Sequence, residues 1–173
     1  HTVFAKSRVR SRFIPDPHNV GGIMPDDRSA DAVLAELFHN EGIHTSFMYL
    51  SEDMMNLAAR MDDYEESAIV QSRHEQDAVT MADGYARHTK DIGLASVGQG
   101  GAIGQTGSSL VTARKRGSNL LVVAPESART TSVDNPTPYS APSPGIAAKD
   151  FDQTGYLRDT IEQVRSVRTP EVL

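Results

Sequence analysis

Short apolar runs alternate with helical patterns along most of the chain, and this alternation limits the folds open to it. Apolar side chains recur three and four positions apart over about residues 29–40, 51–61 and 76–87, and again through Leu110, Val111 and Ala113, which predicts four helices. Short β-prone or apolar runs predict strands at 43–50, 68–70, 94–97 and 120–124. Such alternation is typical of βαβ units, so we expect an α/β fold, a three-layer αβα sandwich with a central parallel sheet.

The sequence also predicts how some of these elements begin and which side they bury. Ser29 and Ser51 are suited to cap the first two helices, because a serine hydroxyl accepts a hydrogen bond from a free amide of the first turn. The apolar side of the second helix is expected to consist of Met54, Met55, Leu57, Ala58 and Met61. The uninterrupted run 120–124 is typical of a central strand that is buried on both faces.

Composition excludes several classes of function. Lys and Arg number 17 against 23 Asp and Glu, a net charge of −6, which argues against a nucleic-acid binder. The chain has no Cys, so thiol catalysis, thiolate-bound zinc and disulfides are excluded. No apolar run approaches the roughly 20 residues of a membrane helix. We therefore expect no membrane partner and a cytoplasmic protein, or one of an organelle matrix if the acid-free start is a remnant of a transit peptide.

The domain organisation follows from where the pattern stops. Residues 1–28 carry four cations before the first acid, Asp16, and then several Pro and Gly, so we expect a flexible tail or linker. Residues 29–173 are expected to form one domain, interrupted by a long loop over 125–149 that holds five prolines. Thr169 and Pro170 are typical of the start of a helix, so we expect the chain to be a piece of something longer that lacks its last helix.

Two segments follow predicted strands directly and are candidates for a binding site, because ligands of parallel sheets lie outside the carboxyl ends of the strands. One is Glu75. The other is a turn rich in glycine, Gly98, Gly100, Gly101, Gly104 and Gly107, which lets a ligand approach the backbone closely. Taken alone, a carboxylate such as Glu75 at a helix start is more simply explained by the free amides of the first turn, which it satisfies. The turn is compatible with a dinucleotide site that uses Gly98, Gly100 and Glu126, although no Gly-Lys-Ser or Gly-Lys-Thr phosphate loop occurs.

The run from Arg73 to Arg87, RHEQDAVTMADGYAR, resembles the signature of thiamine-diphosphate-dependent enzymes. More narrowly, it resembles the pyrimidine-binding domain of the acetolactate synthase, pyruvate oxidase and benzoylformate decarboxylase group. Three further segments follow in the family's order: the glycine-rich turn, the strand 120–124 and Phe151-Asp152-Gln153. The last of these is similar to a segment after the family's variable loop. The resemblance covers about residues 29–173 and implies the family's fold.

The resemblance also implies roles for individual residues. The family glutamate equivalent to Glu75 hydrogen-bonds N1′ of the cofactor's aminopyrimidine and so promotes loss of the proton from C2 of the thiazolium; Glu75 is the implied catalytic residue. Gly98, Gly100, Gly101 and Gln105 are the further implied cofactor-binding residues. Tyr49, Ser51 and Gln99 are the implied substrate-binding residues. No residue of this chain is implied as a metal ligand.

By the same resemblance, the substrate is a 2-oxo acid that is decarboxylated or joined to an acceptor, and the cofactors are thiamine diphosphate and Mg²⁺. The family holds the diphosphate and the metal with a Gly-Asp-Gly motif on a separate domain, and this chain has no such motif. We therefore expect a homo- or hetero-oligomer whose active site is shared with another chain or domain, and expect this chain to be inactive alone. FAD binds some members, mainly on a domain absent here.

The chain departs from the family pattern at the glycine-rich turn. The family's Gly-Pro-Gly is replaced by Gly100-Gly101-Ala102, and its following Asn is replaced by Gln105. These departures motivate a second hypothesis, a non-catalytic binding or regulatory module that kept the fold. The dinucleotide-binding domain is a third hypothesis, and it leaves Arg73-His74-Glu75 unexplained.

Overall fold

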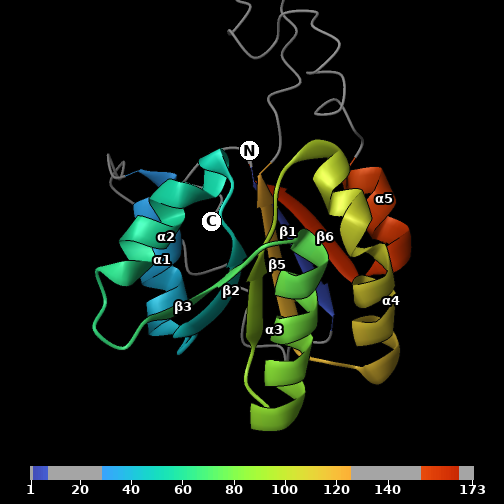
Figure 1. The fold of residues 1–173 in the computed structure, drawn as a ribbon, viewed down its shortest axis with the longest axis horizontal. Coiled ribbons are helices and arrows are strands. Elements are labelled where there is room, and N and C mark those ends of the chain that lie inside the picture. Colours follow the sequence, from blue (N-terminus) through green and yellow to red (C-terminus); the bar gives the residue numbers. More distant parts are fainter. Residues whose placement is uncertain (1, 8–28, 126–152, 168–173) are drawn as a thin grey trace, which may run out of the picture.

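The computed structural model describes residues 2–7, 29–125 and 153–167, which form an α/β sandwich (Figure 1). The strands within these residues are β1 (Thr2–Ser7), β2 (Thr45–Tyr49), β3 (Ala68–Ser72), β4 (Gly93–Ser96), β5 (Leu120–Pro125) and β6 (Gln163–Val167). The α-helices are α1 (Ala30–Asn40), α2 (Met55–Asp62), α3 (Glu75–Thr89), α4 (Gly107–Arg116) and α5 (Gln153–Thr160). Two 3₁₀ segments, η2 (Glu52–Met54) and η3 (Gly100–Thr106), precede α2 and α4.

The sheet has the strand order β3-β2-β4-β5-β1-β6, and its four strands β3, β2, β4 and β5 run parallel. Helices α1 and α2 cover one face, while α3, α4 and α5 cover the other (Figure 1). The predicted αβα sandwich with a parallel sheet is thereby confirmed. The chain passes from β2 to β3 on one side and then returns across β2 to reach β4, so the strand order reverses between β2 and β4. Open parallel sheets bind ligands at such a reversal.

Residues 2–7 form β1, which pairs antiparallel with β5 from Thr2↔Pro125 to Ser7↔Leu120 and also pairs with β6. For these six residues the expectation of a flexible tail is wrong. Without β1, strand β5 would pair with β4 alone, and its other edge would offer unpaired backbone groups. A β-prone segment such as Thr2-Val3-Phe4 is suited to pair with that edge. Residues 8–28, the predicted loop after Pro125 and the predicted helix start at Thr169 lie outside the described residues.

Apolar side chains on the two faces of the sheet form two cores. Against α3, α4 and α5 lie Phe47, Ala95, Val97, Leu120, Val122 and Ala124. Against α1 and α2 lie Met48, Leu94, Leu121 and Val123. All of β5 is buried, as the sequence predicts for a central strand. None of the described helices combines the length with the apolar character that crossing a bilayer requires.

The helix starts agree only in part with the sequence. Ser29 caps α1, since its Oγ accepts a hydrogen bond from the Ala32 amide at 3.3 Å. Ser51 does not cap α2; it precedes η2 and makes no capping hydrogen bond. Met55, placed by the sequence on the apolar side of the second helix, is 57% exposed, because the 3₁₀ turn changes where the helical face begins. The other four predicted apolar residues of that helix are buried.

Helix α3 packs closely on β4 at Gly93, and this contact gives the first prediction. A Cβ at Gly93 would collide with the backbone carbonyl of Ala82. We expect Gly93→Ala to lower the free energy of unfolding by about 1–3 kcal/mol, because overpacked contacts force the backbone to shift. Urea denaturation followed by circular dichroism measures the change.

Gly84 in the same helix provides the matched control, since a Cβ there meets nothing within 4 Å. We expect Gly84→Ala to raise the free energy of unfolding by about 0.5–1 kcal/mol, because alanine is the better helix former. Equal effects of the two substitutions would contradict the described packing of α3 on β4.

Candidate functional site

Three of the residues selected from the sequence come together where β2 and β4 end. Tyr49 is the last residue of β2, Glu75 is the first residue of α3, and Gly98 follows β4. A Cβ at Gly98 would lie 3.2 Å from Glu75 Oε1 and 3.9 Å from Tyr49 Cδ1. The Glu75 carboxylate therefore lies directly over the backbone of the glycine-rich turn, at the reversal of strand order.

Glu75 is only 6% exposed, yet it does not serve as the cap of its helix. His74 has that role: its Nδ1 accepts a hydrogen bond from the Gln76 amide at 3.1 Å. The Ser72 hydroxyl in turn donates to the carbonyl oxygen of His74 at 3.1 Å and fixes the turn between β3 and α3. Capping, the simple explanation for a carboxylate at a helix start, is thus supplied by the neighbouring residue.

The surroundings of the Glu75 carboxylate leave it able to accept a hydrogen bond. Among the residues that the structure describes, none donates a hydrogen bond to it. The first turn of α3 favours a negative charge there, because the free amides at a helix N-terminus carry partial positive charge. A buried carboxylate without a donor is nonetheless costly, so the site is suited to a ligand that brings an N–H group.

The glycine-rich turn is held in place by Gln153 of α5. Gly100 has a φ of +67°, a left-handed conformation that favours glycine, and its amide donates to Gln153 Oε1 at 2.5 Å. Gln153 Nε2 donates to the carbonyl oxygen of Pro125 at 2.9 Å. Gln153 is 1% exposed, so a single buried carboxamide joins the turn to the end of β5. The Phe151 and Asp152 positions of the same motif lie outside the described residues.

The remaining residues selected for the site are more dispersed. The Gly100 amide is occupied by Gln153, and Gly101 and Gln105 are exposed in η3 with no described contact to Glu75. Ser51 Oγ is buried and has no hydrogen-bond partner among the described residues. Gln99 donates a hydrogen bond from Nε2 to Asp53 Oδ2. The cofactor- and substrate-binding roles of these residues stay predictions.

Tyr156 supports the far end of η3. Its hydroxyl donates to the carbonyl oxygen of Gly104 at 3.2 Å and occupies space that a Cβ at Gly107 would take. Burial raises the pKa of the Tyr156 phenol, which keeps the hydroxyl protonated and able to donate.

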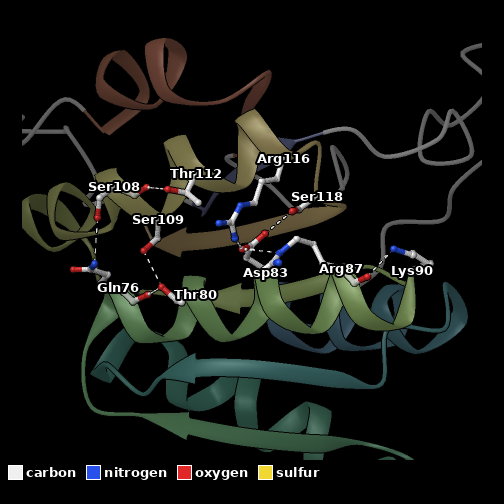
Figure 2. Close-up of polar contacts among 10 residues, drawn as sticks. All are labelled: Gln76, Thr80, Asp83, Arg87, Lys90, Ser108, Ser109, Thr112, Arg116 and Ser118. Atoms are coloured by element: carbon white, nitrogen blue, oxygen red, sulfur yellow. Dashed lines mark hydrogen bonds and ion pairs between the residues drawn. The ribbon is translucent and has the colours of Figure 1, made fainter.

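Polar contacts join α3 to α4 and so fix the helix that begins with Glu75 (Figure 2). The buried Asp83 carboxylate accepts a hydrogen bond from Arg87 Nε at 3.1 Å, lies 3.9 Å from Arg116 Nη1 and bonds the Ser118 hydroxyl. Nearer to Glu75, Gln76 contacts Ser108 and Thr80 contacts Ser109. A groove of about 190 Å³ lies over these contacts and contains none of the residues selected for the site.

The sequence reasoning assigned no structural role to Asp53, Asp83 or Gln153, although Gln153 belongs to the Phe151-Asp152-Gln153 segment. Asp83 had a local indication, because it lies four residues before Arg87 on one helix face. Asp53 bonds a residue that lies 46 positions away in the sequence, and Gln153 bonds one that lies 53 positions away. No periodic pattern marks pairs at such separations.

Within the described residues no three His, Asp or Glu side chains gather in a way suited to hold a metal ion.

The Gln153 contact gives a prediction for stability. Gln153→Leu keeps the side-chain size but leaves the Gly100 amide and the Pro125 carbonyl without partners. We expect the free energy of unfolding to fall by about 3 kcal/mol, because buried polar groups that lose a partner cost roughly 1–3 kcal/mol each. The exposed Gln71 of β3 is the control, and Gln71→Leu should leave stability nearly unchanged. Similar urea midpoints for the two variants would contradict the bridging role of Gln153.

Comparisons with known proteins agree with the fold. The family model described as "Thiamine pyrophosphate enzyme, N-terminal TPP binding domain" matches residues 28–151. No curated protein matches the chain. Among solved structures, the chain is similar to a candidate thiamin diphosphate-dependent enzyme from Mycobacterium smegmatis, with 26% sequence identity and a TM-score of 0.54. The match covers 64% of this chain and 21% of that one, so it spans about a fifth of the solved protein.

The family match covers well over half of the chain and includes the run from Arg73 to Arg87 on which the resemblance rests. It favours thiamine diphosphate over the dinucleotide alternative, and Glu126, which that alternative needs, lies outside the described residues. The chain belongs to the thiamine pyrophosphate enzyme family and contains its N-terminal TPP-binding domain.

Proposed function

We propose that this chain is the pyrimidine-binding part of an enzyme that uses thiamine diphosphate to decarboxylate a 2-oxo acid or to join it to an acceptor. The observation that carries the proposal is the Glu75 carboxylate, which is buried beside the bare backbone of Gly98 and receives no hydrogen bond from the described residues. An aminopyrimidine suits this position, because a flat ring with a protonated nitrogen meets the need of the carboxylate for a donor.

The residues of the site have separate tasks in this proposal. When bound, thiamine diphosphate supplies an acidic carbon and an electron sink for the reaction. Glu75 accepts the hydrogen bond from the pyrimidine nitrogen N1′ and stabilises its protonated form. Gly98 leaves room for the ring over the turn, since any side chain there would meet Glu75. Tyr49 lines the same place from the end of β2 and is proposed, with Ser51 and Gln99, to meet the substrate.

The proposal requires a second domain. This chain has no Gly-Asp-Gly sequence, and the similar structure from Mycobacterium smegmatis is matched over only 21% of its length. We propose that another domain or subunit holds the diphosphate and Mg²⁺, and that the active site forms where that domain meets the carboxyl ends of β2 and β4. An oligomer is therefore the proposed working form.

The altered turn supports one alternative, a module of the same family that has lost catalysis. Alanine at position 102 and glutamine at 105 replace the family residues of the turn, and the Ala102 side chain lies 3.1 Å from the position of a Gly98 Cβ, close to the proposed ring site. Such a module would fold normally and show no saturable binding of the cofactor in the complete assembly.

Substitution of Glu75 tests the proposed chemistry. Glu75→Gln keeps the size of the side chain but removes the charge that stabilises protonated N1′. We expect kcat for cofactor-dependent release of CO₂ from 2-oxo acids to fall by about 10²- to 10⁴-fold, the usual contribution of one positioned proton-transfer group. The thermal midpoint should stay close to that of the parent protein. Rates are measured on the full-length protein in its assembled form.

Asp77, an exposed acid in the same helical turn, is the matched control. Asp77→Asn removes the same charge two residues away and should leave kcat unchanged. Full activity of the Glu75→Gln protein would remove Glu75 from the mechanism. Absence both of turnover and of saturable cofactor binding in the parent protein would favour the non-catalytic module.

A further inference from the structure

A direct hydrogen bond joins the two loops that follow β2 and β4. Gln99 Nε2 donates to Asp53 Oδ2 at 2.5 Å, across 46 positions of sequence. Asp53 lies in η2, which begins three residues after the end of β2, and Gln99 is the residue after Gly98. Asp53 has no role in the family resemblance, so this contact is known from the structure alone.

The position of this contact connects it to the candidate site. Strands β2 and β4 are neighbours, and their last pair is Met48↔Ser96. The contact between Asp53 and Gln99 therefore spans the two strand ends between which Tyr49, Glu75 and Gly98 gather. Gln99 is the direct neighbour of Gly98, which faces Glu75. A change in the orientation of Gln99 therefore takes place beside the candidate site.

The chemistry of the two groups determines which end of Gln99 faces Asp53. A carboxylate only accepts hydrogen bonds, whereas a carboxamide has one donating and one accepting end. Asp53 therefore selects the Nε2 end of Gln99 and turns the Oε1 end away from itself. Bonds to a charged acceptor are shorter and stronger than neutral ones, which agrees with the short distance.

Exposure indicates that this bond contributes to orientation more than to stability. Asp53 is exposed and Gln99 is half-buried, and charged contacts open to water add little to the free energy of unfolding. Variants of either residue should therefore fold, and their effects on the site can be measured in folded protein.

We propose that Asp53 is a positioning residue: it holds the Gln99 carboxamide in one orientation and, through it, fixes the start of the glycine-rich turn against the end of β2. Gln99 then meets the 2-oxo acid in a defined geometry, while Asp53 itself does not touch the reacting atoms. This inference rests on the proposed function for its substrate and on the structure for the contact.

Five variants of the full-length, cofactor-loaded protein test the proposal. They are Asp53→Ala, Asp53→Asn, Gln99→Ala, the double variant Asp53→Ala/Gln99→Ala, and Asp62→Ala as control. Asp62 is an exposed acid at the other end of α2, so its removal changes the net charge equally without touching Gln99. The measurements are kcat and KM for 2-oxo acids, cofactor affinity, and hydrogen–deuterium exchange of peptides that cover residues 94–106.

We expect Asp53→Ala to raise KM about tenfold, because Gln99 would no longer be oriented and would lose its hydrogen bond to the charged 2-oxo acid. The values of kcat and cofactor affinity should stay unchanged. Asp53→Asn should restore part of the loss, because its carbonyl oxygen still accepts from Gln99. The double variant should be no worse than Gln99→Ala, since the two residues act as one unit. Asp62→Ala should behave as the parent protein.

Hydrogen exchange tests the contact independently of activity. Asp53→Ala should speed exchange in the 94–106 peptides, and Asp62→Ala should not. If exchange is faster but the parent protein turns over no 2-oxo acid, the proposed function fails while the positioning of Gln99 stands. If Asp53→Ala matches the control in exchange and in KM, or if the two single effects on KM add in the double variant, the positioning proposal is overturned.

Discussion

The placement of one buried carboxylate beside a bare stretch of backbone is the constraint on which the site depends. Glu75 can lie there because β3 ends at Ser72 and the chain turns directly into α3, with His74 taking over the capping of the helix. Gly98 can lie opposite because the turn after β4 has no side chain at that point. The two meet since β2 and β4 are neighbours and the strand order reverses between them.

The packing around this point keeps it in place. On one side, α3 is joined to α4 through Asp83 and its basic neighbours (Figure 2), and Gly93 lets α3 approach β4 closely. On the other side, Gln153 joins the glycine-rich turn to the end of β5. The site is therefore held from both sides by contacts whose polar groups are satisfied within the chain, whereas the described residues provide no donor to the Glu75 carboxylate. Glu75 differs in this respect from Asp83 and Gln153, whose polar groups are bonded within the chain.

Much of the fold could be predicted from the sequence, because it depends on local patterns. The four parallel strands and the helices α1 to α4 follow from periodicity and from short β-prone runs, and Glu75 was found through the Arg73–Arg87 motif. Strand β1 was missed because its partner, β5, is far away in the sequence and the basic residues after it are typical of a tail. The contacts of Asp53 and Gln153 were missed for a related reason, since they join side chains that only the folded sheet brings together.

The central claim is that the Glu75 carboxylate receives a hydrogen bond from the pyrimidine ring of thiamine diphosphate. A crystal or cryo-electron microscopy structure of the full-length protein with the cofactor bound tests it most directly. The account predicts a Glu75 oxygen about 2.7–2.9 Å from N1′, the length of a charge-assisted hydrogen bond, with the ring over Gly98. A well-ordered cofactor whose pyrimidine lies away from Glu75, or whose N1′ is bonded to another residue, would contradict it.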